Sequence, residues 1–65
     1  MKVRIFTPAD NEPDIHSVDI PEVQAYVEFI KKFGVLDENG AVCKVDSVLY
    51  DSHQNAIDIV CVEAD

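Results

Sequence analysis

The sequence predicts an α+β fold, a single two-layer domain of residues 1–65 in which one α-helix packs on a three-stranded, mainly antiparallel sheet in the order β-α-β-β. Three observations predict this fold. With 65 residues the chain is limited to one domain. Only the segment 19–33 has apolar residues at helical spacing. The segments 2–7, 41–50 and 56–63 have the alternation or the apolar density of strands.

The first strand is predicted at residues 2–7, where polar and apolar side chains alternate and Val3 and Ile5 would face the core. Pro8 would end this strand, because proline has no N–H for a strand ladder. The acidic segment 9–18 follows and contains a second proline, so we expect it to be a loop.

Residues 19–33 have the pattern of an amphipathic helix. Asp19 followed by Glu22 is typical of a capping box, and Pro21 suits the first turn of a helix. Gly34 is expected to end the helix. The predicted apolar stripe consists of Val23, Tyr26, Val27, Ile30 and Phe33.

The last two strands, 41–50 and 56–63, are predicted to form an antiparallel hairpin. Segment 56–63 is apolar on both faces, which favours a central position with segment 2–7 on its other side. The apolar phase of segment 41–50 changes at Asp46 and Ser47, a change typical of a β-bulge.

A single helix covers only one face of such a sheet, so the opposite face is expected to expose apolar side chains. A large exposed apolar patch usually marks an interface. If the chain self-associates through this face, the homodimer contact is expected at Val48, Tyr50, Val60 and Val62.

The charge of the chain is strongly negative, with 13 Asp and Glu against 5 Lys and Arg and a net charge of −8. Such a surface repels nucleic acid and anionic membranes and attracts basic proteins. Direct nucleic-acid binding is disfavoured, because its affinity comes mostly from Lys and Arg. The acids expected to face a basic partner are Asp10, Glu12, Asp14, Asp19, Glu22, Asp37, Glu38, Asp46, Asp51 and Asp58.

The sequence has no catalytic motif, no Gly-rich phosphate loop and no CxxC pair, so we expect no enzyme activity, no cofactor and no metal. Cys43 and Cys61 are predicted to be buried free thiols, with a cross-strand disulfide or a metal site as the alternatives. A signal peptide and a membrane-spanning apolar run are both missing, which predicts a soluble cytoplasmic protein.

In size, acid clustering and its predicted one-helix-plus-sheet fold, the chain resembles the small acidic inhibitors that phages encode against bacterial DNA-handling machinery. These include anti-CRISPR proteins and inhibitors of DNA-repair glycosylases. The resemblance implies a non-enzymatic inhibitor in the host cytoplasm that mimics the charge of DNA and occupies a basic DNA-binding protein or complex. The alternatives are a self-associating structural or assembly module, a small enzyme, and a charge that serves solubility alone.

Overall fold

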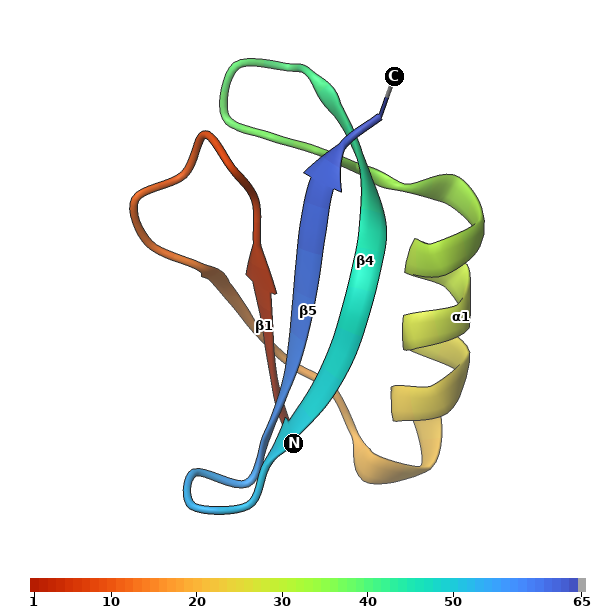
Figure 1. The fold of residues 1–65 in the computed structure, drawn as a ribbon. Coiled ribbons are helices and arrows are strands. Elements are labelled where there is room, and N and C mark those ends of the chain that lie inside the picture. Colours follow the sequence, from red (N-terminus) through yellow and green to blue (C-terminus); the bar gives the residue numbers. More distant parts are fainter. Residues whose placement is uncertain (65) are drawn as a thin grey trace.

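The computed structural model describes residues 1–64 and has an α+β fold with one α-helix (Figure 1). Its elements are β1 (Lys2–Phe6), β2 (Asp14–Ser17), the 3₁₀ turn η1 (Ile20–Glu22), α1 (Val23–Phe33), β3 (Val35–Leu36), β4 (Val42–Asp51) and β5 (Ala56–Glu63). The strands form one five-stranded sheet in the order β2-β1-β5-β4-β3. β1 pairs with β5 in parallel, and every other neighbouring pair is antiparallel.

The prediction of a three-stranded, mainly antiparallel sheet in the order β-α-β-β is wrong, because the sheet is mixed and has two further strands. β2 lies within the segment 9–18 that was predicted to be a loop, and it pairs with β1. All four residues of β2 are exposed, so the segment lacks the burial alternation that marks a strand in sequence. β3 has only two residues, which is too short for any periodicity to be seen. The expectation that segment 56–63 is the central strand is confirmed.

The helix begins later than its sequence pattern predicts. Residues 20–22 form the 3₁₀ turn η1, and the side chain of Asp19 makes no capping hydrogen bond. The backbone N–H of Glu22 donates instead to the carbonyl oxygen of Asp19 at 2.8 Å. Gly34 ends the helix as expected, with φ of 79° and its N–H donating to the carbonyl oxygen of Ile30 at 2.8 Å. No helix within residues 1–64 has the length and apolar character required to cross a lipid bilayer.

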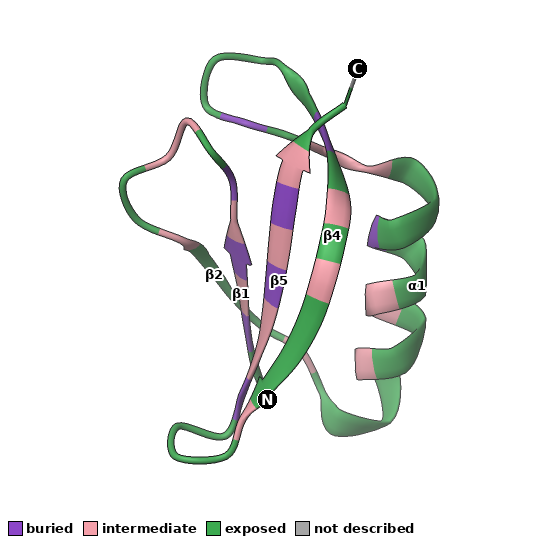
Figure 2. Cartoon of the chain, viewed as in Figure 1, coloured by how far each residue is buried: buried purple, intermediate pink, exposed green. Residues whose placement is uncertain are grey.

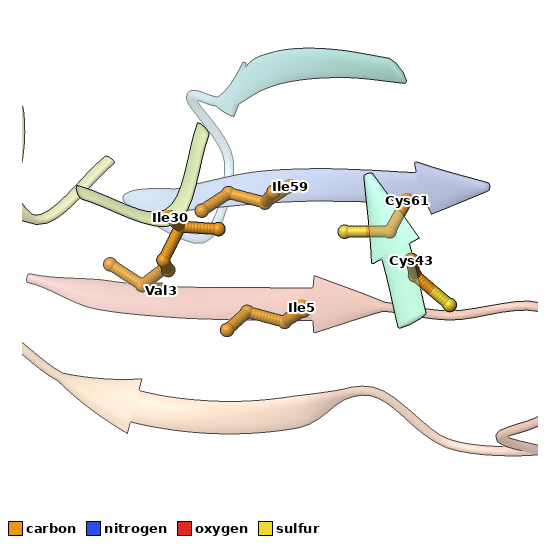
Figure 3. Packing of buried hydrophobic residues seen from close by; sticks show 6 residues of the cluster. All are labelled: Val3, Ile5, Ile30, Cys43, Ile59 and Cys61. Carbon is orange, nitrogen blue, oxygen red and sulfur yellow. The ribbon is translucent and has the colours of Figure 1, made fainter. Parts of the chain in front are cut away.

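The core lies between α1 and one face of the sheet, which we call the helix face. Ile30 is the one buried residue of α1 and packs against the central strands (Figure 3). The buried cluster consists of Val3, Ile5, Ile30, Cys43, Ile59 and Cys61. Figure 2 shows that the outer side of α1 and much of β4 are exposed. The other side of the sheet, which carries no helix, is the open face.

The predicted bulge in β4 is confirmed. Val45 lies opposite Cys61 and Ser47 lies opposite Val60, so Asp46 is an extra residue on β4. An inserted residue moves every later side chain of the strand to the other face of the sheet.

This shift changes which apolar residues of β4 share a face. Val48 lies opposite the core residue Ile59, which places Val48 and Tyr50 on the helix face. Val60 and Val62 alternate with the core positions of β5 and therefore project to the open face. The sheet thus divides the four residues predicted for self-association between its two faces.

Candidate functional site

Acidic side chains from two segments converge on an open hollow at one end of the sheet. The hollow lies between the loop that joins β1 to β2 and the turn that follows β3, and Figure 1 shows both at the same end of the molecule. Its lining consists of Asp10, Asn11, Glu12, Asp14, Leu36, Asp37 and Glu38. We call this surface the acidic hollow. It joins Asp10 to Glu38 across 28 positions of sequence.

Two of these acids accept hydrogen bonds from backbone groups of the turn after β3. Asp37 is buried, and its Oδ1 accepts hydrogen bonds from the backbone N–H groups of Asn39 and Ala41, both at 2.9 Å. Asp10 accepts a hydrogen bond from the backbone N–H of Glu38 at 3.2 Å, which ties the first loop to the second. Asp10 therefore links the two walls of the acidic hollow, and Asp37 braces the wall to which it belongs.

The other acids of the hollow are exposed to solvent. They are Glu12, Asp14 and Glu38. The ion pairs within residues 1–64 involve Asp51, Asp58 and Glu28, and none of them includes a carboxylate of the acidic hollow. The negative potential of the hollow is therefore not offset by an ion-paired base within this part of the chain.

The acidic hollow offers the chemistry of exposed carboxylates on an open surface. Within the described residues, no group of three or more His, Cys, Asp or Glu side chains is arranged to hold a metal ion. An open surface of carboxylates is of a kind that can accept hydrogen bonds from Lys or Arg side chains, whose charged groups lie at the end of long aliphatic chains.

The remaining acids selected from the sequence lie elsewhere. Asp19 precedes the 3₁₀ turn η1, Glu22 is the last residue of that turn, and Asp46 is the extra residue of the bulge. All three are exposed. Asp51 and Asp58 lie on the open face, where both bind Arg4. Five of the ten acids therefore gather at the acidic hollow, and the other five lie elsewhere on the molecule.

Arg4 forms the main ion-pair network of the open face. Its Nε and one terminal nitrogen donate to the two oxygens of Asp58 at 2.5 and 2.8 Å, a bidentate geometry. The same terminal nitrogen donates to Asp51 at 3.0 Å, and the other donates to Gln54 at 3.1 Å. Arg4 on β1 thereby binds the hairpin that joins β4 to β5. Two acids expected to face a partner are already engaged within the fold.

The charges in this network shift the pKa values of its members. The hydrogen bonding that Arg4 donates to Asp58 raises the pKa of the Arg4 guanidinium, although burial acts in the opposite direction. The backbone N–H of Gln54, together with Arg4 and the N–H of His53, lowers the pKa of the Asp51 carboxyl below its ordinary value. Asp51 is therefore held in its charged form.

The open face carries exposed apolar residues that the sequence did not identify. Ile15 on β2 lies opposite Arg4, Leu36 on β3 lies opposite Val42, and Leu49 on β4 lies opposite Asp58. Ile15, Leu36 and Leu49 are 58–63% exposed. Leu36 also lines the acidic hollow. The alternation of β4 predicts Leu49 on the open face only when the extra residue Asp46 is taken into account for the residues that follow it.

The helix has a second apolar edge on its solvent side. The rings of Phe29 and Phe33 lie 4.8 Å apart between centroids, and both side chains are more than 60% exposed. The spacing of Ala25, Phe29 and Phe33, four residues apart, is the sequence signal for this edge.

The prediction that Cys43 and Cys61 are buried free thiols is confirmed. Figure 3 shows them on the neighbouring strands β4 and β5. Burial, followed by the nearby carboxylate of Asp37, raises the pKa of the Cys43 thiol. Burial also raises the pKa of Cys61. Both side chains are therefore protonated, unreactive parts of the core at neutral pH.

Comparison of the chain with models of protein families, with curated proteins and with solved structures gives no match.

Proposed function

We propose that this chain is a non-enzymatic binding protein that uses the acidic hollow to occupy a basic surface of a DNA-binding protein or nucleoprotein complex and so keeps DNA from it. The observation that carries this proposal is the convergence of five carboxylates, from segments distant in sequence, on one open surface without an ion-paired base. DNA presents about one negative charge per 1.7 Å of helix axis. A cluster of fixed carboxylates offers a comparable target to a basic groove.

The hydrogen bonds within the hollow support this proposal. Asp10 links the loop between β1 and β2 to the turn after β3, and Asp37 braces that turn, so the backbone of the turn that carries Glu38 is ordered before a partner arrives. Preorganised charges bind with a smaller loss of conformational entropy than charges on a flexible tail. The net charge of −8 also speeds the approach of a basic partner through long-range attraction.

The test uses two triple variants that change the net charge by the same amount. The first, Glu12→Gln with Asp14→Asn and Glu38→Gln, removes the exposed acids of the hollow and spares the structural pair Asp10 and Asp37. The matched control, Asp19→Asn with Glu22→Gln and Asp46→Asn, removes exposed acids outside the hollow.

Each immobilised protein is presented with the proteins that a double-stranded DNA resin retains from a bacterial lysate. We expect the native chain and the control variant to capture a protein that free double-stranded DNA and raised salt both displace. We expect the hollow variant to lose this capture. Equal capture by both variants would contradict the assignment to the hollow, and capture that DNA does not displace would contradict the mimicry of DNA.

A further inference from the structure

One edge of the sheet is unpaired over most of its length. β4 has ten residues, but β3 pairs only with Val42 and Cys43 at its beginning. Residues 44–51 have β5 on one side and no strand of residues 1–64 on the other. None of the backbone hydrogen bonds outside the regular ladders reaches this stretch. We call residues 44–51 the free edge of β4.

The middle of the free edge is apolar, although Lys44, Asp51 and the bulge at Asp46 lie on either side of it. Natural edge strands carry charges, bulges, proline or a covering segment, because their open backbone groups pair readily with other strands. Val48, Leu49 and Tyr50 follow one another here and are 38%, 58% and 56% exposed. Val48 and Tyr50 lie on the helix face beyond the cover of α1, whereas Leu49 lies on the open face. A strand added at this edge would place its own side chains beside Val48 and Tyr50 on one face and beside Leu49 on the other.

The sequence of the free edge is complementary to itself. We propose that two copies of this chain pair through β4, antiparallel and centred on Val48, so that the two sheets become one continuous sheet. If Asp46 remains the extra residue in each copy, Val48 lies opposite the second copy's Val48 and Val45 lies opposite the second copy's Tyr50. These pairs are apolar, and all of them lie on the helix face.

The same register also matches on the open face. Ser47 lies opposite the second copy's Leu49, and Lys44 lies opposite the second copy's Asp51. Lys44 has no ion pair within residues 1–64, and Asp51 retains about a quarter of its side-chain exposure while it binds Arg4. The two-fold axis produces the Lys44–Asp51 pair twice. The paired stretch ends where β3 begins to cover β4, so the register uses the whole free edge.

Self-pairing has a salt dependence opposite to that of the proposed function. Each copy carries a net charge of −8, so two copies repel one another at low ionic strength. Apolar strand pairing persists as salt screens this repulsion. We therefore expect dimerisation to strengthen with salt, whereas binding of a basic partner weakens. The two proposals can fail independently, because none of the residues replaced in the hollow variant lies on the free edge of β4. Asp46, which is replaced in the control variant, lies on this edge but is the extra residue and belongs to none of the proposed pairs.

The first experiment measures the mass of the native chain by sedimentation velocity over a range of concentrations and salt. We expect a species of twice the 7.3 kDa of one chain, with a dissociation constant that falls as salt rises. Val48→Lys puts two like charges against each other on the two-fold axis and should weaken the dimer about 100-fold or more. Ile15→Lys is the matched control, because Ile15 is an exposed apolar residue on the opposite edge strand, β2.

A monomer at all concentrations and salts overturns the proposal. A dimer that Ile15→Lys disrupts as strongly as Val48→Lys, or that Val48→Lys leaves intact, also overturns it. Circular dichroism of each variant establishes that the fold is retained.

A second experiment does not depend on the tolerance of a charge at Val48. Directly opposed strand residues have the Cα separation that a disulfide requires. The variant Val48→Cys should therefore form a disulfide-linked dimer rapidly on mild oxidation, while Ile15→Cys should remain largely monomeric. The native thiols do not interfere, because both are buried. Equal cross-linking of the two variants would reject the central position of Val48.

Discussion

Arg4 and Asp58 are direct neighbours across the parallel pair β1 and β5, and they form a bidentate ion pair with N–O distances of 2.5 and 2.8 Å. Both side chains are mostly covered, with 14% and 20% of their surface exposed. The pair lies on the open face, directly behind the apolar core. It therefore joins the two strands that are most distant in sequence on the side of the sheet that no helix covers.

Replacing Arg4 with methionine should destabilise the fold, because Asp58 and Asp51 lose their common partner and remain partly covered. We expect the melting temperature at pH 7 to fall by about 4–8 °C. Lys2→Met is the matched control, since Lys2 lies on the same strand, is exposed and makes no ion pair within residues 1–64. A similar loss in both variants would mean that net charge, and not the network, determines the effect.

The stability of the fold should depend on pH through Asp51. The pKa of this carboxyl is lowered in the folded chain, so its contribution is fully present above its ordinary pKa of 3.8 and is lost as pH falls through the lowered value. Asp51→Asn should therefore be destabilising at pH 7 and progressively less so below pH 3.8. Urea unfolding of both proteins at several pH values measures the difference. A constant difference between neutral and strongly acidic pH would contradict the pKa shift.

The core should respond most strongly at Ile59, which is completely buried on the central strand. We expect Ile59→Ala to lower the free energy of unfolding by about 2–5 kcal/mol. Ile15→Ala makes the same chemical change at a 58% exposed strand residue and should cost within about 0.5 kcal/mol. Urea denaturation of the two variants provides the comparison, and equal costs would mean that Ile59 is not in a close-packed core.

The two glycines should differ in their tolerance of alanine although both have positive φ, 79° at Gly34 and 81° at Gly40. A Cβ on Gly34 would lie 2.8 Å from the carbonyl oxygen of Cys43, whereas a Cβ on Gly40 meets nothing within 4 Å. Gly34→Ala should therefore cost about 1–3 kcal/mol more than Gly40→Ala. Thermal unfolding of both variants tests this, and similar losses would show that backbone conformation alone sets the cost.

The sequence was sufficient to predict the elements that bury apolar residues. Segment 56–63 is apolar on both faces, and it is β5, the central strand, with the predicted bounds. Gly34 ends α1 where expected, because a positive φ is required there. β2 was not predicted, since its four exposed residues have no buried face to impose alternation. The capping box at Asp19 was not formed, because the backbone turns through η1 before α1 begins.

The candidate site was predicted less completely than the fold. The abundance of acidic residues in the sequence indicated an acidic surface. Local sequence does not show, however, that the loop around Glu12 and the turn around Glu38 lie at the same end of the sheet. That proximity depends on β2 and β3, the two strands that sequence periodicity did not reveal. Pairing of Asp51 and Asp58 with Arg4 depends in the same way on the parallel contact between β1 and β5. Tertiary topology therefore determines which acids remain free.

The position of β5 also determines the order in which the chain can fold. β5 is the last strand in sequence, yet it lies between β1 and β4 and supplies the buried residues Ile59 and Cys61. When the nascent chain has been synthesised only as far as Asn55, β5 is missing, and β1 and β4 have no strand between them with which to pair. The sheet is therefore complete only after β5 has emerged, because its pairing with β1 closes a loop from Lys2 to Ala56. Until then the apolar side chains of the early strands remain open to chaperones and proteases.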